Sequence, residues 1–493
     1  MLVIMSDLHF TDGDPKSTKR PARPTIGEGA FKVFRHRLRD MAYDASWRLR
    51  PKQRESGTKP DDFVYEPISE LDIVLLGDIF DIIRSDQWGF GNNAIRPWDY
   101  GTSAAKTEKV TQTVSAITDG ILRRNRASHD ILKELTMPPK RNSRSLSVTL
   151  PPAKEGAPDP DVGWEPWAVG RQHVKVRIHY MVGNHDWLYH VSGPGFDQIR
   201  ARIKNALGLE NDPKQPFPHD PEESPIISQV LADHDAFARH GDIYDSFNFE
   251  GERDASSLGD AIVIELLNRF PAEVAARLKK GLKGVPPEVV DGLKEIDNVR
   301  PLLLAPVWID GLLRRLCKDH KQIKQVKAVW NELVHAFFKI PFIKSRDSWL
   351  NPWDNVDKLQ AALTLSSGLS LHTASRLLQW TTEQGLKEPD SYYEEALTEP
   401  NFKNQTARYI VYGHTHHHQI VPLDVSYPKQ GELNQLYMNA GTWRRVHGLA
   451  RLKTKDEEFI GHNVMTYLAF FKGDERCGRS FEAWSGALAP PPA

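Results

Sequence analysis

The stretch MLVIMSDLH, residues 1–9, sets the expected fold because it reads as a buried strand that ends in polar side chains. Met1 to Ser6 is an apolar run of the length and composition of a strand. Residues two apart on a strand point to the same face of the sheet, so Asp7 and His9 can face one ligand. We therefore expect a site at the carboxyl end of this strand.

Four further blocks place polar side chains in the same way, three of them directly after an apolar run. They are Gly77-Asp78-Ile79-Phe80-Asp81, Gly183-Asn184-His185-Asp186, His240-Gly241-Asp242 and Gly413-His414-Thr415-His416. In open α/β sheets, ligands bind in the crevice beyond the strand ends. A glycine at such a point lets the chain turn sharply and pass close to a bound ion. The five blocks together predict one site built from distant parts of the chain.

Each block alone has an ordinary explanation. Gly-Asn-His-Asp can be a plain turn, because glycine, asparagine and aspartate are turn formers. The run His414–His418 can be a solvated polar turn, although histidine-rich tracts also bind metal. The joint occurrence of all five blocks favours a dinuclear metal site. Two adjacent divalent ions hold a phosphoryl group and an attacking oxygen in line, so the pattern indicates phosphoryl chemistry.

The complete pattern resembles the calcineurin-like metallophosphoesterase superfamily, whose motifs run D-x-H, G-D-x-x-D, G-N-H-[DE], H and G-H-x-H. Every block is present without substitution. The resemblance implies that one ion is held by Asp7, His9, Asp78 and His416. It implies that the second ion is held by Asp78, Asn184, His240 and His414, with Asp78 bridging the two. His185 would be the catalytic histidine beside the phosphate, supported by Asp81 and Asp186.

The resemblance also implies the fold, which is α/β: an αββα four-layer sandwich of two mixed sheets packed face to face with helices outside. We expect this core to comprise residues 1–251 and 404–486, with insertions at about 11–70 and 86–170. Residues 252–403 are helical in pattern, with helix signals that include 356–365 and 372–382, and are expected to form a helical cap or insertion beside the metal site.

The histidine between the third and last blocks is the ligand with nearby alternatives. His219 and His234 lie close to His240 in the sequence. We prefer His240 because residues 235–239 read as a short strand that His-Gly-Asp then ends.

The ligand types indicate which metals the site would take. Four histidines combined with carboxylates favour transition ions over Mg²⁺ or Ca²⁺. We expect manganese, with iron, zinc, cobalt and nickel as alternatives. A water shared by two cations loses its proton near neutral pH and becomes a nucleophile. The predicted activity is hydrolysis of a phosphodiester, pyrophosphate or phosphomonoester by direct attack of this hydroxide, without a covalent enzyme intermediate.

The expected substrate is a phosphorylated small molecule or a nucleotide. The first, second and fourth blocks resemble the branch that contains UDP-2,3-diacylglucosamine hydrolases, although the large insertions depart from those compact enzymes. A manganese-dependent DNA or RNA nuclease is the alternative activity, and a non-catalytic scaffold with this fold is the alternative of another class. Arg444 and Arg445 follow a predicted strand end, where one could bind a substrate phosphate with two hydrogen bonds. An ordinary surface position is the other interpretation of these arginines.

Composition sets the outer limits. The chain has 493 residues, 40% apolar and 26% charged, with a net charge of −1, so it gives no general argument for nucleic acid or membrane binding. Two cysteines and no long apolar stretch favour a cytoplasmic protein without a membrane span. The first predicted strand begins at Met1, which leaves no room for a signal peptide. Nothing in the sequence indicates the oligomeric state.

One segment is locally basic. Residues 14–59 hold 13 lysines and arginines against 5 aspartates and glutamates. We interpret the segment as a solvated amphipathic helix with Phe31, Phe34, Leu38 and Met41 on its apolar face. A basic surface that draws an anionic substrate toward the site is the alternative.

Overall fold

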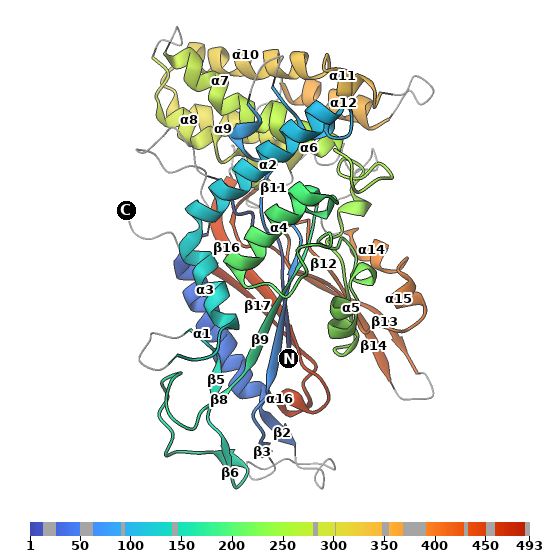
Figure 1. Cartoon of the computed structure of the whole chain (residues 1–493). Coiled ribbons are helices and arrows are strands. Elements are labelled where there is room, and N and C mark those ends of the chain that lie inside the picture. The colour runs from blue at the N-terminus through green and yellow to red at the C-terminus, as the bar shows by residue number, and fades with distance from the viewer. Residues whose placement is uncertain are drawn as a thin grey trace.

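The protein is a mixed α/β protein with a central sheet flanked by helices (Figure 1). The computed structural model describes residues 1–12, 26–49, 63–89, 94–140, 146–279, 284–300, 302–347, 354–367, 391–427, 432–449 and 459–488. The helix expected at 372–382 and residues 14–25 and 50–59 of the basic segment lie outside these ranges. Among the described residues, no helix is both long and apolar enough to cross a membrane.

The central sheet has a parallel core that determines where the first three blocks lie. Its strand order is β11-β15-β16-β1-β4-β9, with β17 beside β16. The strands are β1 (Leu2–Met5), β4 (Glu70–Leu76), β9 (Lys175–Met181), β11 (Val299–Arg300), β15 (Arg445–Leu449), β16 (Phe459–Phe470) and β17 (Phe481–Leu488). β1, β4 and β9 are parallel, whereas β16 is antiparallel to β1. Since parallel strands end at one edge, the segments after β1, β4 and β9 meet there.

A second sheet supplies the remaining blocks. Its order is β10-β12-β14-β13, with β10, β12 and β14 parallel and β13 antiparallel to β14. The strands are β10 (Ala236–Ala238), β12 (Tyr409–Tyr412), β13 (Gln419–Ser426) and β14 (Leu433–Asn439). His240 follows β10, and His414 and His416 follow β12, so the carboxyl ends of these strands carry histidines.

The two sheets pack face to face through a buried apolar layer. Leu2, Ile4 and Val74 of the central sheet share this layer with Val411 and Met438 of the second sheet. The alternate residues of β1, Val3 and Met5, belong to the core on the other face. A strand buried on both faces reads as a continuous apolar run, which explains the sequence at the start of the chain.

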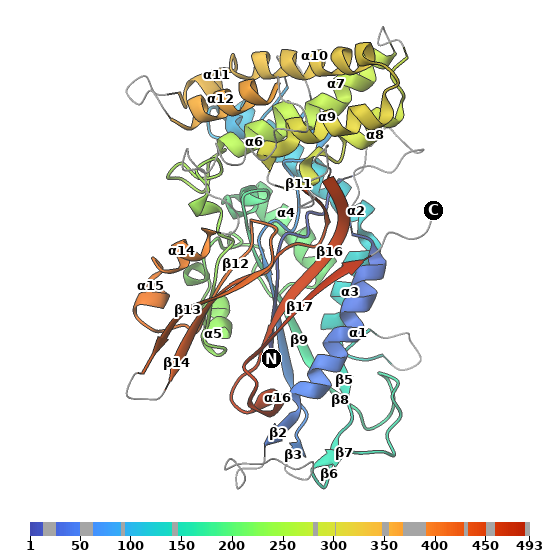
Figure 2. The same ribbon diagram turned by 180° about the vertical axis from the view of Figure 1, so that it is seen from behind.

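Helices cover the outer faces of both sheets (Figures 1 and 2). On the central sheet lie α1 (Glu28–Ala45), α2 (Ala104–Arg124), α3 (Arg126–Thr136) and α4 (Pro194–Leu207). α1 buries Phe31, Phe34, Leu38 and Met41, which confirms the amphipathic helix for the described part of the basic segment. On the second sheet, Tyr392 and α14 (Tyr393–Ala396) pack against Ile410 and Tyr437. α5 (Pro225–Ala232) and α15 (Pro400–Lys403) flank it.

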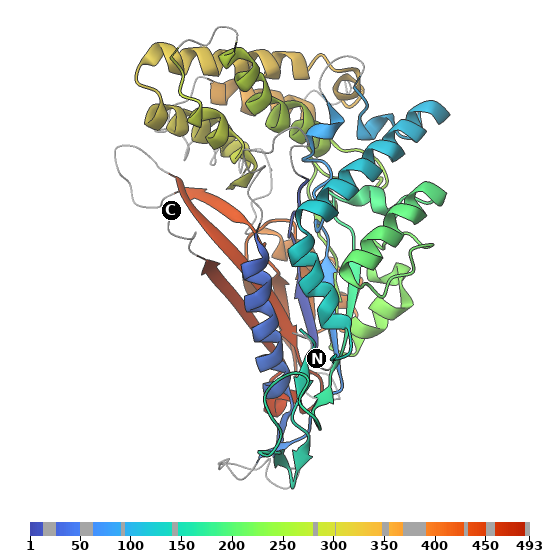
Figure 3. The same ribbon diagram turned by 60° about the vertical axis from the view of Figure 1, so that its left-hand side comes forward.

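A layer of helices from the long insertion lies across the end of the molecule where the strand ends meet (Figure 3). It contains α6 (Leu258–Ile262), the π-helix η8 (Val263–Asn268), α7 (Arg269–Leu278), α8 (Glu288–Leu293), α9 (Ala305–Leu316), α10 (His320–Phe337), α11 (Pro341–Lys344) and α12 (Asn355–Ser367). One short strand of the insertion, β11, departs from the helical pattern and joins the central sheet beside β15.

Short two-stranded ribbons and one turn lie at the end of the molecule opposite the helical insertion. Three two-stranded ribbons pair β2 (Trp47–Leu49) with β3 (Phe63–Tyr65), β5 (Thr149–Leu150) with β8 (Gln172–His173), and β6 (Ala153–Lys154) with β7 (Ala157–Pro158). The turn α16 (Glu475–Gly478) lies between β16 and β17. Glu475 binds the terminal amino group of Met1 there, with N and Oε2 3.3 Å apart.

His129 makes folding stability depend on pH. Its ring is buried against Phe10 and Phe80, and neither ring nitrogen has a hydrogen-bond partner. Burial lowers the pKa of His129 to about 3, whereas the unfolded chain takes up this proton near its ordinary value of 6.5. The contribution of His129 to stability is therefore complete above about pH 6.5, and this contribution falls by about 1.4 kcal/mol per pH unit as the pH drops toward 3.

We predict that His129→Phe makes this acid-side slope shallower, because phenylalanine keeps the ring stack and binds no proton. Denaturant unfolding of the metal-free protein between about pH 6.5 and pH 4 measures the slope. His335→Phe, at an exposed position, is the control. Equal slopes for His129→Phe and the wild type would contradict the prediction.

Candidate metal centre

The five blocks converge at the edge where the strands of both sheets end. Five of the predicted ligands adopt the left-handed backbone conformation that side-chain-bearing residues rarely use. They are Asp7, His9, Asp78, His414 and His416, with φ of 55°, 46°, 53°, 65° and 59°. Such conformations persist only where surrounding structure enforces them, and they gather at functional sites. These turns bend the chain where each strand ends, so that the side chains point toward one another.

One group of donor atoms comes from Asp7, His9 and His416. His416 Nε2 lies 3.0 Å from Asp7 Oδ1 and 2.9 Å from His9 Nε2, and all three side chains are buried. Two ligand atoms about 2.1 Å from one ion and at right angles lie about 3 Å apart, so these separations fit a single cation. Asp7 Oδ1 is buried, and the nearby ring nitrogens of His416 and His9, at 3.0 and 3.5 Å, belong to the other two candidate ligands, as expected of an atom available to a metal.

A second group lies beside the first. His240 Nε2 is 3.3 Å from Asp78 Oδ2 and 3.2 Å from Asn184 Oδ1. The same Asn184 oxygen is 3.0 Å from His414 Nδ1. Oxygen and imidazole nitrogen at these separations again fit one cation.

Asp78 stands between the two groups. Its Oδ2 lies 3.3 Å from His240 Nε2 in the second group and 3.7 Å from His9 Nε2 in the first. Its other oxygen, Oδ1, accepts a hydrogen bond of 2.8 Å from the backbone N–H of His185. The side chain is therefore held in the position that a bridging carboxylate needs.

Further hydrogen bonds orient the histidines. The remaining ring nitrogen of His9 contacts Asp81 Oδ2 at 3.0 Å, and that of His240 contacts the Leu76 carbonyl at 3.0 Å. His414 presents Nε2 to Asp245 Oδ2 at 3.1 Å. Contacts of this kind fix the tautomer and leave the other nitrogen for a metal. Asp245 belongs to none of the five blocks, and no sequence motif singles it out.

Asp186 connects the second and third blocks through hydrogen bonds. Its carboxylate accepts hydrogen bonds from the N–H groups of Ile79 and Gly183, at 2.9 and 2.6 Å, and from the Tyr180 hydroxyl at 2.6 Å. These hydrogen bonds hold the two turns together, and a supporting role of Asp186 at a metal centre stays a prediction.

The charges of the site are mutually balanced. Burial alone would raise the pKa of Asp78, but the charges of His240 and His185 hold it well below its ordinary value. Burial lowers the pKa of His240, whereas Asp78 and Asp7 raise it to about 10. Asp78 is thus ionised, and a cation bound there would compete with the proton on His240.

His185 lies beside both groups and lines the cavity next to them. Its Nδ1 is 2.6 Å from Asp81 Oδ1, and its ring lies edge-on to His9. Burial lowers the pKa of His185, but the nearby Asp81 and Asp78 raise it to about 10. The imidazole is therefore protonated here, and Asp81 holds one nitrogen so that the other remains for a ligand.

The structure brings a different arginine to the site from those expected. Arg444 donates to Asp297 Oδ2 at 2.7 Å, and Arg445 donates to Glu295 Oε1 at 3.2 Å, so both connect the central sheet to the insertion. Arg300 of β11 instead lines the cavity and donates from Nη2 to His416 Nδ1 at 2.7 Å. A substrate-binding role of Arg444 and Arg445 stays a prediction.

The alternative histidines lie elsewhere. His234 contacts the Val230 carbonyl at 2.8 Å. His219 and His190 both contact Asp254, at 3.2 and 2.7 Å from its Oδ1. Only His240 of the three alternatives reaches Asp78 in the described structure.

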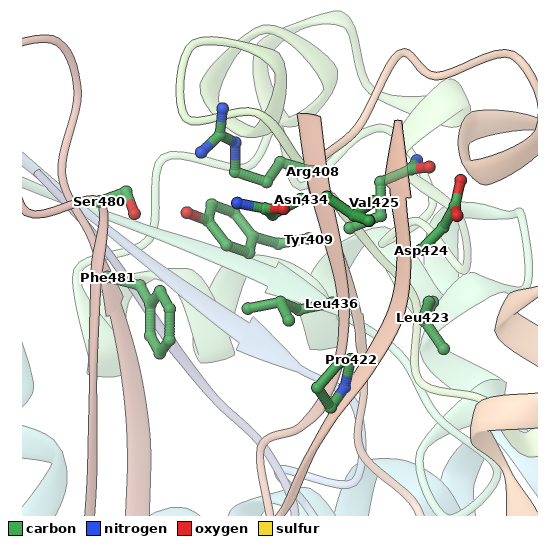
Figure 4. A pocket seen from close by; sticks show the side chains of 11 residues that line it. Arg408, Tyr409, Pro422, Leu423, Asp424, Val425, Asn434, Leu436, Ser480 and Phe481 are labelled. Carbon is green, nitrogen blue, oxygen red and sulfur yellow. The ribbon is translucent and has the colours of Figure 1, made fainter. Parts of the chain in front are cut away.

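Two hollows differ in their relation to these groups. A cavity of about 500 Å³ opens on the metal-binding side chains and extends into the insertion. A hollow of about 610 Å³ lies between the second sheet and the segment around Ser480 and Phe481, where Arg408, Tyr409 and Asp424 line it (Figure 4). It contains none of the predicted site residues.

A scan of protein-family models finds no match to this chain, and a search of the curated proteins finds none either. The site is therefore interpreted from its own geometry. Buried histidine and aspartate groups that can hold metal ions lie at the strand ends, around Asp7, His9 and His416 and around Asp78, His240 and His414.

The close approach of Gly183 to the ligands gives a test of the geometry. A Cβ atom there would lie 2.5 Å from Asp78 Oδ1 and 2.7 Å from His240 Nε2. We predict that Gly183→Ala displaces these side chains and weakens Mn²⁺ binding about 10- to 100-fold, as measured by calorimetric titration. Gly29→Ala is the control, since a Cβ on Gly29 meets nothing within 4 Å. Unchanged affinity in a folded Gly183→Ala variant would refute the arrangement.

Proposed function

We propose that this chain belongs to the calcineurin-like metallophosphoesterase superfamily and hydrolyses a phosphoester with two divalent ions. The observation that carries the proposal is the placement of Asp78 Oδ2, 3.3 Å from His240 Nε2 and 3.7 Å from His9 Nε2. The order of layers (helices, central sheet, second sheet, helices) supports the αββα core, with residues 1–251 and 404–486 as that core and 252–403 as a helical cap.

Two sets of side chains would hold the two ions. Asp7, His9, Asp78 and His416 would hold one ion, and Asp78, Asn184, His240 and His414 the other. Bound together, the ions would supply Lewis acidity and an activated water near neutral pH.

His185 and Arg300 act on the substrate in this proposal. A protonated His185 can donate a hydrogen bond to a phosphate oxygen or a proton to the leaving oxygen, while Asp81 keeps its ring in place. Arg300 adds a buried positive charge beside His416, where a phosphate oxygen would bind. The histidine-rich donor set favours manganese or another first-row transition ion.

Metal content tests the bridging position. We predict that the protein retains two equivalents of Mn²⁺ per chain after dialysis and that Asp78→Ala loses both, because this carboxylate serves both groups. Elemental analysis by mass spectrometry measures the ratio. A wild-type protein that binds no transition ion, or an Asp78→Ala variant that keeps two, would contradict the proposal.

Activity tests the role of His185. We predict that His185→Ala lowers kcat for bis(4-nitrophenyl) phosphate by about 10²- to 10⁴-fold, because proton transfer and phosphate binding are lost while all metal ligands remain. Retained metal content shows that the loss is chemical. His417→Ala, an exposed histidine next to the last block, is the matched control. Wild type and variant that are equally inert with metal bound would indicate a non-catalytic scaffold.

A further inference from the structure

The cavity beside the metal-binding groups changes character along its length. At one end it is lined by polar residues, including Asp78, His185 and Arg300. At the other end the insertion supplies apolar side chains from four separate elements. These are Val263, Leu266 and Leu267 of η8, Ala305 and Pro306 of α9, Trp330 of α10, and Leu359 and Leu363 of α12. A ligand with a charged head and an apolar body matches this gradient.

If it bound nothing, the apolar end of the cavity would lower the stability of the folded protein. A void next to apolar side chains forfeits packing contacts, so interiors normally fill such space. η8 is a π-helix, and π-helical turns are rare and frequent at functional sites. It places Val263, Leu266 and Leu267 on one side, at the cavity wall.

Buried ion pairs hold the insertion at a fixed distance from the metal-binding residues. Arg96 Nε lies 2.5 Å from Glu265 Oε1 in η8, and the Asn268 amide donates to the Ile83 carbonyl at 3.0 Å. Arg444 binds Asp297, next to β11. The cavity wall is therefore anchored to the segment that follows β4 and to the central sheet, so the space between them is defined.

The lining also argues against a nucleic acid strand as the occupant. Strands of nucleic acid bind in grooves where many cations follow the phosphate backbone. Arg300 is the sole lysine or arginine among the described residues that line this cavity. A cavity of about 500 Å³ lies within the size range of pockets that bind small organic ligands, roughly 300–1,000 Å³.

We propose that the apolar end of this cavity binds the hydrophobic part of the substrate, so that the substrate class is a phosphoester of a hydrophobic alcohol. The inference rests on the proposed phosphoesterase function, because it places the phosphate at Asp78, His185 and Arg300. The insertion thereby selects the substrate through the length of the apolar group, and the strand-end residues act on the phosphate.

Binding of unreactive phosphonates tests this inference apart from catalysis. Methyl-, butyl- and octylphosphonate are titrated calorimetrically into the Mn²⁺-loaded protein. Each methylene buried should lower Kd about three- to fourfold until the cavity is filled. Leu266→Gln and Leu359→Gln should each reduce the ratio of methyl to octyl Kd at least tenfold. Ile226→Gln, an exposed apolar position on α5, should leave that ratio unchanged.

The outcomes separate the two proposals. Equal Kd values for the three phosphonates in the wild type overturn the inference, even where bis(4-nitrophenyl) phosphate is hydrolysed. A chain-length dependence that survives both glutamine variants also overturns it, since the alkyl group then binds elsewhere. Chain-length dependence without hydrolysis of any phosphodiester supports the cavity and defeats the proposed function. If a glutamine variant fails to fold, the wild-type series still decides.

Discussion

The buried carboxylate of Asp78 is the constraint on which the rest of the structure depends. A charge this far from water is tolerated only if opposite charge and hydrogen bonds surround it. Its partners come from both sheets, with His9 at the end of β1 and His240 at the end of β10. The sheets must therefore pack face to face in one register, because a slip of one residue would turn the strand-end side chains away. The packing of the two sheets and the pairing of the buried Asp78 charge thus require the same arrangement of the strand ends.

Much of this arrangement was readable from the sequence. Apolar runs located β1, β4, β9 and β12, and the polar blocks after them meet at one edge. The convergence of these blocks follows from topology, because strand ends meet at one edge in parallel sheets. Their division into two ligand groups was implied by the resemblance to the metallophosphoesterase motifs. The helical spacing of Phe31, Phe34, Leu38 and Met41 likewise predicted an amphipathic helix, which α1 confirms. These features are local patterns, or simple consequences of topology, and a single sequence contains them.

Other features depend on tertiary contacts that no local pattern records. Arg300 lies on a strand of two residues inside a helical stretch, so nothing marked it as a neighbour of His416. Asp245 orients His414 but follows no strand. Arg444 lies directly before β15 and not after the end of a strand, and its partner Asp297 is 147 positions away in the sequence. Packing decides which arginine faces the cavity and which one joins the central sheet to the insertion. The periodicity of the sequence carries no information on that choice.

The cavity wall has two parts, the strand-end turns and the helices of the insertion, and the two parts differ in how freely their residues can be replaced. Its charged end is built by turns that tolerate almost no change, since a single added methyl group at Gly183 collides with two donor side chains. Its apolar end is built by helices whose side chains can be exchanged for others of similar volume at modest cost. Mutation can therefore change the size and shape of the apolar space while the candidate metal centre stays unaltered.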